Sequence, residues 1–144
     1  MKKTILAVLL IALTAAALPA RTVLIATENT AYKRNLVEVL KEKLEAEDID
    51  VVVIDHQRDR LDAVNPEEYD AVYVLNSGAQ ARVRPVVLEW LSQVADNDDN
   101  VILHTTQRTV WTPPVEVDSI TSASRRSNIG TVTDDIVSRI KAKF

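Results

Sequence analysis

The sequence contains no cysteine and only two glycines, Gly78 and Gly130. Without cysteine the chain forms no disulfide, no thiol nucleophile and no thiolate metal site, and no lipid can be attached to a cysteine behind an export signal. Asp55 and His56 stand together, but a metal site needs more ligands in a fixed geometry. The sequence therefore predicts neither thiol chemistry nor a resident metal.

Long apolar runs are absent outside the N-terminus. Residues 1–20 begin with two lysines, continue with an apolar stretch and end in small residues, which is typical of a secretory signal peptide. The stretch also approaches the roughly 20 residues of a membrane span, so a retained anchor is the alternative. Pro19 and Ala20 resemble a cleavage region and a strand-like segment follows at once. These features favour cleavage and a periplasmic or secreted domain over residues 21–144.

Basic residues are in deficit. The chain has 17 Lys and Arg against 21 Asp and Glu, and loss of Lys2 and Lys3 leaves 15 against 21, a net charge of −6. Because neutralisation of phosphates supplies much of the affinity for nucleic acid, an acidic domain is a poor candidate for that partner. The length suits one domain, and 47% hydrophobic content is ample for its core.

Strand-like and helix-like segments alternate along the domain. Strands are predicted over 22–27, 50–55, 71–76, 101–106 and, more weakly, 118–122. The second has three consecutive valines, which leave no polar face for water and predict burial on both sides. Amphipathic helices are predicted over 31–47, over 84–95 and at the C-terminus, where Thr131 with Asp134 can cap the last helix.

This alternation predicts an α/β domain with a five-stranded, mainly parallel sheet and helices on both faces. The segment 107–117 contains two prolines and is about as short as a parallel crossover can be. A full helix is not expected there, and the direction of the fifth strand stays open.

Four short motifs extend across nearly the whole domain. They are TVLIATENT before a long helix, the tyrosine–aspartate lead in NPEEYDAVYVLNSG, the helix start ARVRPVVLEWL, and NVILHTTQ. In their order and spacing they resemble the flavodoxin-like family. The resemblance implies a flavodoxin-like three-layer sandwich with strand order 2-1-3-4-5. It also implies a ligand edge beyond the carboxyl ends of the strands, where the order reverses between the first and third strands.

The loop after the first strand departs from the family's pattern. Family members carry a T-x-T-G-x-T phosphate cradle there, whose backbone N–H groups converge on the phosphate of flavin mononucleotide (FMN). This sequence has ATENTA, without the glycine, and Glu28 brings negative charge to the place of the anion. Thr27, Asn29 and Thr30 can still supply hydroxyl and amide contacts. FMN is therefore retained as a candidate cofactor, but not as a tightly bound one.

The other candidate binding residues follow the third and fourth strands. They are Asn76, Ser77, Gly78, Arg82, Arg84, Thr106 and Arg108. Guanidinium groups recognise carboxylate or phosphate by paired hydrogen bonds, so the arginines indicate an anionic ligand, although ordinary surface arginines are the alternative. The glycine either permits a tight turn or close ligand approach, or is an ordinary loop residue.

Catalytic alternatives depend on His56, His104 and Ser77. Histidine titrates near neutral pH, but these two follow strands that are not adjacent in the expected order. Ser77 lies in NSGA, which lacks the glycine pattern of a hydrolase nucleophile elbow. Structural roles are therefore favoured for both histidines, and no catalytic residue is assigned.

Two functions are compatible with these residues. The first hypothesis is an exported binding or accessory domain without tightly bound flavin, which engages an anionic small molecule or a protein partner at the strand ends. The alternative is a periplasmic FMN protein of electron transfer or quinone reduction, in which the flavin does the redox work. The missing glycine, Glu28 and the lack of a catalytic constellation favour the first.

We expect the exported form to begin close to Arg21, because only the N-terminal segment has membrane character. N-terminal sequencing of the protein from the extracytoplasmic fraction measures this directly. A chain that still begins at Met1 and fractionates with membranes would show that the segment is an anchor.

Overall fold

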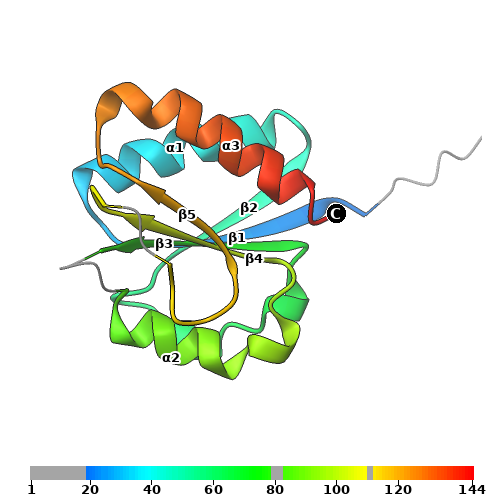
Figure 1. The fold of residues 1–144 in the computed structure, drawn as a ribbon. Helices are drawn as coiled ribbons and strands as arrows, with labels where there is room; N and C mark the ends of the chain where they lie inside the picture. Colours follow the sequence, from blue (N-terminus) through cyan, green and yellow to red (C-terminus); the bar gives the residue numbers. More distant parts are fainter. Residues whose placement is uncertain (1–18, 79–82, 110–111) are drawn as a thin grey trace, which may run out of the picture.

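The computed structural model describes residues 19–78, 83–109 and 112–144, and within them five parallel strands form one sheet in the order β2-β1-β3-β4-β5 (Figure 1). Both the strand count and the order expected from the sequence are confirmed. The strands are β1 Arg21–Thr27, β2 Ile49–Asp55, β3 Ala71–Ser77, β4 Val101–Thr106 and β5 Asp118–Ser122. Of the residues singled out above, Arg82 lies outside the described residues.

Three helices cover the sheet and complete the three-layer sandwich. They are α1 Ala31–Glu45, α2 Pro85–Gln93 and α3 Ile129–Lys141. The first and third lie against one face and α2 against the other (Figure 1). The predicted cap at Thr131 is wrong: α3 begins two residues earlier, because a 3-10 turn over Arg126–Asn128 runs directly into it. No helix in the described part of the chain is both long and apolar enough to cross a bilayer.

The direction of the fifth strand is now fixed. β5 pairs with β4 in parallel, in a register that runs from Ile102 beside Asp118 to Thr106 beside Ser122. The described residues between these strands form no helix, as their prolines predicted. All of β5 is therefore only half-buried.

The core consists of two apolar clusters, one on each face of the sheet. Tyr73 and Leu75 of β3 point to the α1 and α3 side, whereas Val72 and Val74 point to the α2 side. Trp90 of α2 is buried in the second cluster, and its indole N–H donates to the carbonyl of Val64 at 3.0 Å. This alternation is the period of two expected for a strand that is covered on both faces.

β2 is the exception, and the prediction that it is buried on both faces is wrong. Val52 is 41% exposed and Val53 is 43% exposed, on opposite sides of the strand. The strand lies at the edge of the sheet, and the chain from β2 to β3 forms only 3-10 turns, over Leu61–Ala63 and Pro66–Glu68. Because no long crossover helix follows β2, its valines stay in contact with solvent.

We expect Val74→Asp to destabilise the domain severely, because Val74 is fully buried in the central strand β3. An unpaired carboxylate in an apolar core costs several kcal/mol, against a total stability of about 5–15 kcal/mol. Val86→Asp is the matched control, because Val86 is 41% exposed on α2. Denaturant unfolding of both variants measures the difference, and equal losses would contradict the strand assignment.

Candidate functional site

The carboxyl ends of β1 and β3 meet at a buried glutamate. Glu28, the residue after β1, is 1% exposed. Its carboxylate accepts hydrogen bonds from Lys33 Nζ at 2.7 Å, Ser77 Oγ at 2.6 Å, the Ser77 backbone N–H at 3.1 Å and Arg84 Nε at 2.5 Å. Four donors from three segments of the chain therefore converge on one carboxylate.

Local structure brings these donors to the carboxylate. The Thr30 hydroxyl caps α1 by accepting from the Lys33 backbone N–H at 3.3 Å, so Lys33 lies in the first turn of the helix, 1% exposed. Lys33 Nζ also donates to the Ser77 hydroxyl. Arg84 directly precedes α2, and its backbone N–H donates to the Asn76 side-chain oxygen at 3.2 Å. Each donor is thus fixed by the start of a helix or the end of a strand.

The Glu28 carboxylate stays ionised although it is buried. Burial alone raises the pKa of the Glu28 carboxyl, but hydrogen bonds from Lys33, Ser77 and Arg84 outweigh it and lower the pKa to about 2. Burial lowers the pKa of the Lys33 ammonium below its ordinary value, and the carboxylate beside it opposes that shift. The cluster is therefore an ion pair reinforced by Arg84, whose side chain is 43% exposed.

The polar residues expected to hold an anion in the first loop are used within the protein. Thr30 caps α1, Asn29 accepts from the Arg34 guanidinium at 2.8 Å, and Thr27 Oγ1 donates to the Glu28 carbonyl at 3.3 Å. The structure brings all three to the expected edge of the sheet. Their polar groups contact the protein itself, which gives them structural partners there.

The candidates after β3 and β4 lie side by side, as expected for paired parallel strands. The Thr106 hydroxyl donates to the Asn76 carbonyl at 3.3 Å, and the Gly78 N–H donates to the Thr106 carbonyl at 3.1 Å. A Cβ on Gly78 would lie 2.3 Å from Gln107 Oε1. The glycine therefore permits close approach, and the group that approaches it is the protein's own glutamine.

Comparison with known proteins identifies the fold. No protein-family model and no curated protein matches the sequence. A flavodoxin from the domain Archaea matches with a TM-score of 0.56 and 11% identity, over 85% of this chain and 98% of its own. A Streptococcus pneumonia flavodoxin matches with a TM-score of 0.55 and 13% identity, over 87% and 100%. The chain has a flavodoxin-like fold.

The same fold also occurs as part of a larger enzyme. A Francisella novicida lysine decarboxylase matches with a TM-score of 0.59 and 10% identity over 88% of this chain, which spans only 18% of that protein. At such identities the likeness shows the flavodoxin-like fold alone. The two whole flavodoxins nevertheless show that this fold, at this length, forms a complete domain in other proteins.

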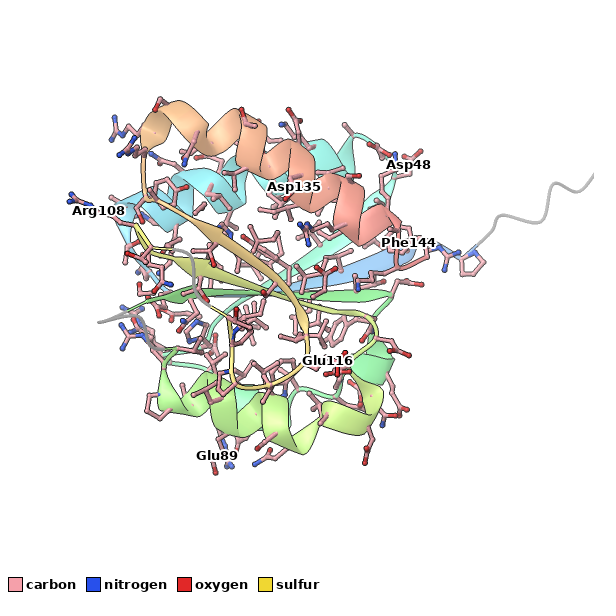
Figure 2. All side chains as sticks on the ribbon, in the orientation of Figure 1. Asp48, Glu89, Arg108, Glu116, Asp135 and Phe144 are labelled. Carbon is pink, nitrogen blue, oxygen red and sulfur yellow. The ribbon has the colours of Figure 1, made fainter. Side chains whose placement is uncertain are left out.

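The arginines do not form a single site among the described residues of this flavodoxin-like domain. Arg84 contacts Glu28 at the ends of β1 and β3. Arg108 is exposed and extends from the molecule (Figure 2), where it lines a hollow of about 260 Å³ with Arg125 between the ends of β4 and β5. Arg82 falls outside the described residues. The expected anion site is therefore divided between two places on the same edge.

Both histidines have structural partners. His104 is fully buried, and its ring nitrogens lie 2.5 Å from the Tyr73 hydroxyl and 2.7 Å from Ser122 Oγ. Burial, assisted by the charge of Lys33, lowers the pKa of His104 to about 3, so the ring is neutral near pH 7. His56 is also buried, with Nε2 donating to the Leu75 carbonyl at 3.0 Å. The described residues hold no cluster of His, Asp and Glu able to bind a metal ion.

We expect acid to destabilise the domain in two stages. In the folded state the pKa of His104 is lowered from 6.5 to about 3, so below pH 6.5 the unfolded chain binds a proton that the folded chain rejects. Stability then falls by about 1.4 kcal/mol per pH unit. The pKa of Glu28 is lowered from 4.5 to about 2, so its contribution is complete above pH 4.5 and is lost toward pH 2.

Denaturant unfolding at a series of pH values measures both stages. His104→Gln should flatten the dependence between pH 6.5 and 4.5 and leave the lower stage in place. Glu28→Gln should keep the fall between pH 6.5 and 4.5 and make the fall below pH 4.5 less steep, because His104 still contributes down to about pH 3. Stability that stays constant between pH 6.5 and 4.5 in the unmodified protein would contradict the buried neutral state of His104.

Proposed function

We propose that this chain is an exported binding or accessory domain that uses the flavodoxin-like fold without tightly bound FMN. One observation carries the proposal: the carboxylate of Glu28 uses the hydrogen-bond donors that an anionic ligand would need. These donors lie at the switch point, the place between β1 and β3 where the strand order reverses. The protein thus supplies an internal anion where the resemblance to flavodoxins implies a phosphate.

The residues at this point do not fit a phosphate in addition to the carboxylate. Lys33 and Ser77 are already bonded to Glu28, and the pKa of about 2 keeps that carboxyl ionised at any physiological pH. A phosphate would meet a like charge in a buried place, where screening by water is weak. Removing the glutamate from its partners would leave Lys33 buried without a counter-ion, which is strongly destabilising.

The partner in this proposal is an anionic small molecule or an acidic protein surface at the same edge. Arg108 and Arg125 support it, because both are exposed and neither forms an ion pair with any described residue. Export is supported by the signal-like residues 1–20 and by the start of β1 at Arg21. Cleavage before Arg21 leaves every strand intact.

We expect the purified protein to be colourless and to take up no FMN. Flavin absorbance of the isolated protein, followed by calorimetric titration of FMN into it, measures both. The titration is essential, because flavin can be lost during purification. A yellow protein, or stoichiometric uptake, would overturn the proposal in favour of the electron-transfer or quinone-reductase alternative, which the two flavodoxin neighbours make the second candidate.

Inorganic phosphate tests whether the Glu28 carboxylate occupies the place of a bound anion. Glu28→Ala removes both the charge and the bulk of the side chain and leaves Lys33 and Arg84 without their counter-ion, so phosphate should raise the melting temperature of this variant more than chloride at equal ionic strength. The unmodified protein and Glu38→Ala, at an exposed position on α1, should show only the smaller preference that phosphate gives any folded protein and that the exposed arginines add. An equal phosphate effect in all three proteins would mean that Glu28 does not stand in for an anion.

A further inference from the structure

The exposed edge of β2 combines three features that usually do not occur together. It is apolar, with Val52 and Val53 each more than 40% exposed. Among the described residues no strand lies beyond it, so its outer backbone groups have no ladder partner. The strand carries no lysine or proline and pairs with β1 in an unbroken register, and its two charged residues, Asp50 and Asp55, lie on either side of the three valines. Such an edge favours addition of another strand.

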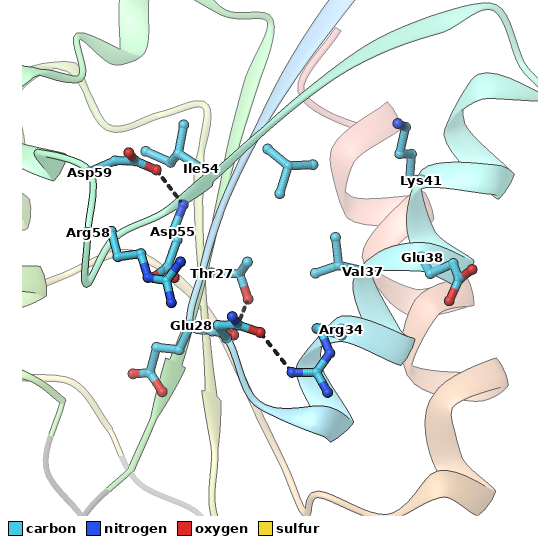
Figure 3. A pocket seen from close by; sticks show the side chains of 12 residues that line it. Thr27, Glu28, Arg34, Val37, Glu38, Lys41, Ile54, Asp55, Arg58 and Asp59 are labelled. Carbon is cyan, nitrogen blue, oxygen red and sulfur yellow. Dashed lines mark hydrogen bonds and ion pairs between the residues drawn. The ribbon is translucent and has the colours of Figure 1, made fainter.

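A cleft of about 640 Å³ opens between α1 and the carboxyl half of β2, where the loop after β1 closes one end of it (Figure 3). Val53 and Ile54 line it from the strand, and Val37 lines it from the helix. Arg34, Glu38 and Lys41 project from the same side of α1. The exposed apolar strand is therefore bordered by a charged helix face.

The charges on that helix face alternate in sign. Arg34, Glu38, Lys41 and Glu45 follow each other at spacings of four, three and four residues, which places them in one line along α1. Lys41 and Glu45 already approach to 3.5 Å within the helix. When two copies of this line face each other in opposite directions, each positive charge lies opposite a negative charge. When they face each other in the same direction, like charges lie opposite each other.

The midpoint of the helix lies close to the midpoint of the strand. α1 has 15 residues and β2 has seven, which correspond to about 22 Å and about 23 Å of length. Both extend over the same length of the sheet, since α1 begins after the carboxyl end of β1 and β2 returns beside β1 in register, and Glu38 and Lys41 line the cleft together with Val53. A twofold axis near Val52 therefore also passes near the middle of the charged line, between Glu38 and Lys41.

We propose that β2 is the pairing edge for a second copy of this chain. The two β2 strands run antiparallel about a twofold axis near Val52, so that one continuous sheet crosses both copies. Val51 and Val53 are on the α1 side of the strand. Val51 then lies opposite Val53 of the second copy, and Val53 lies opposite Val51 of the second copy. Glu38 lies opposite Lys41 of the second copy, and Arg34 opposite Glu45 of the second copy.

The charge order is what selects a second copy over an unrelated extended peptide. Any peptide can use the backbone of an exposed edge, but a helix with the reversed charge order beside that edge is present on this chain itself. The line carries two positive and two negative charges, so it brings no net repulsion to the interface although the domain is acidic. This surface is separate from the arginines at the ends of β4 and β5.

Sedimentation velocity over a range of concentrations tests the pairing. The unmodified protein should form a concentration-dependent dimer. Glu38→Lys alone or Lys41→Glu alone places like charges opposite each other twice in the dimer and should weaken it about tenfold. The double swap Glu38→Lys with Lys41→Glu restores opposite charges and should restore the dimer. Val53→Lys should abolish it, whereas Val86→Lys, at a similarly exposed valine on α2, should have no effect.

Circular dichroism of each variant at low concentration checks that the monomer is folded. We expect it to be, because all the substituted positions are exposed. A protein that stays monomeric at every concentration overturns the proposal. So does a dimer that Val53→Lys leaves unchanged. A dimer that is broken at Val53 but is weakened equally by the single and double charge changes rejects the second copy's α1 as the facing element, and with it this arrangement.

Discussion

A buried carboxylate where the strand order reverses, between β1 and β3, determines how the carboxyl edge of the sheet is built. Glu28 could not be buried without its partners, because an unpaired ion in a protein interior is strongly destabilised. Its burial therefore requires Lys33 on α1, Ser77 at the end of β3 and Arg84 before α2 to occupy fixed positions. One constraint thus ties together the first crossover, the central strand and the helix on the opposite face.

The second determinant is unequal cover over the two ends of the sheet. The central strands β1, β3 and β4 are covered on both faces and are almost wholly buried. β2 is followed only by 3-10 turns, and β5 is reached by a connection without a helix in its described residues. Both edge strands consequently keep contact with solvent. Of the two, β2 exposes the larger apolar surface, since its sequence is that of a buried strand.

The sequence was sufficient for the sheet but not for the environment of each strand. The apolar runs of β3, β4 and β2 look alike, yet burial depends on the partner elements, and the missing helix after β2 decides the difference. The Lys33 ion pair also escaped prediction, although a signal was present. Lys33 falls on the same helical stripe as Leu36, Val37 and Leu40. A lysine at an inward position needs a nearby acid, and Glu28 lies five residues before it.

An internal anion has a different consequence for function from a bound one. A phosphate stabilises its site only in proportion to its concentration, whereas a tethered carboxylate is present at all times. The loop after β1 is therefore held in one arrangement without any ligand, and its polar side chains are used as caps and internal partners. This edge is therefore a preformed surface, on which Arg84, Arg108 and Arg125 are among the exposed charges, rather than a loop that must close around a ligand.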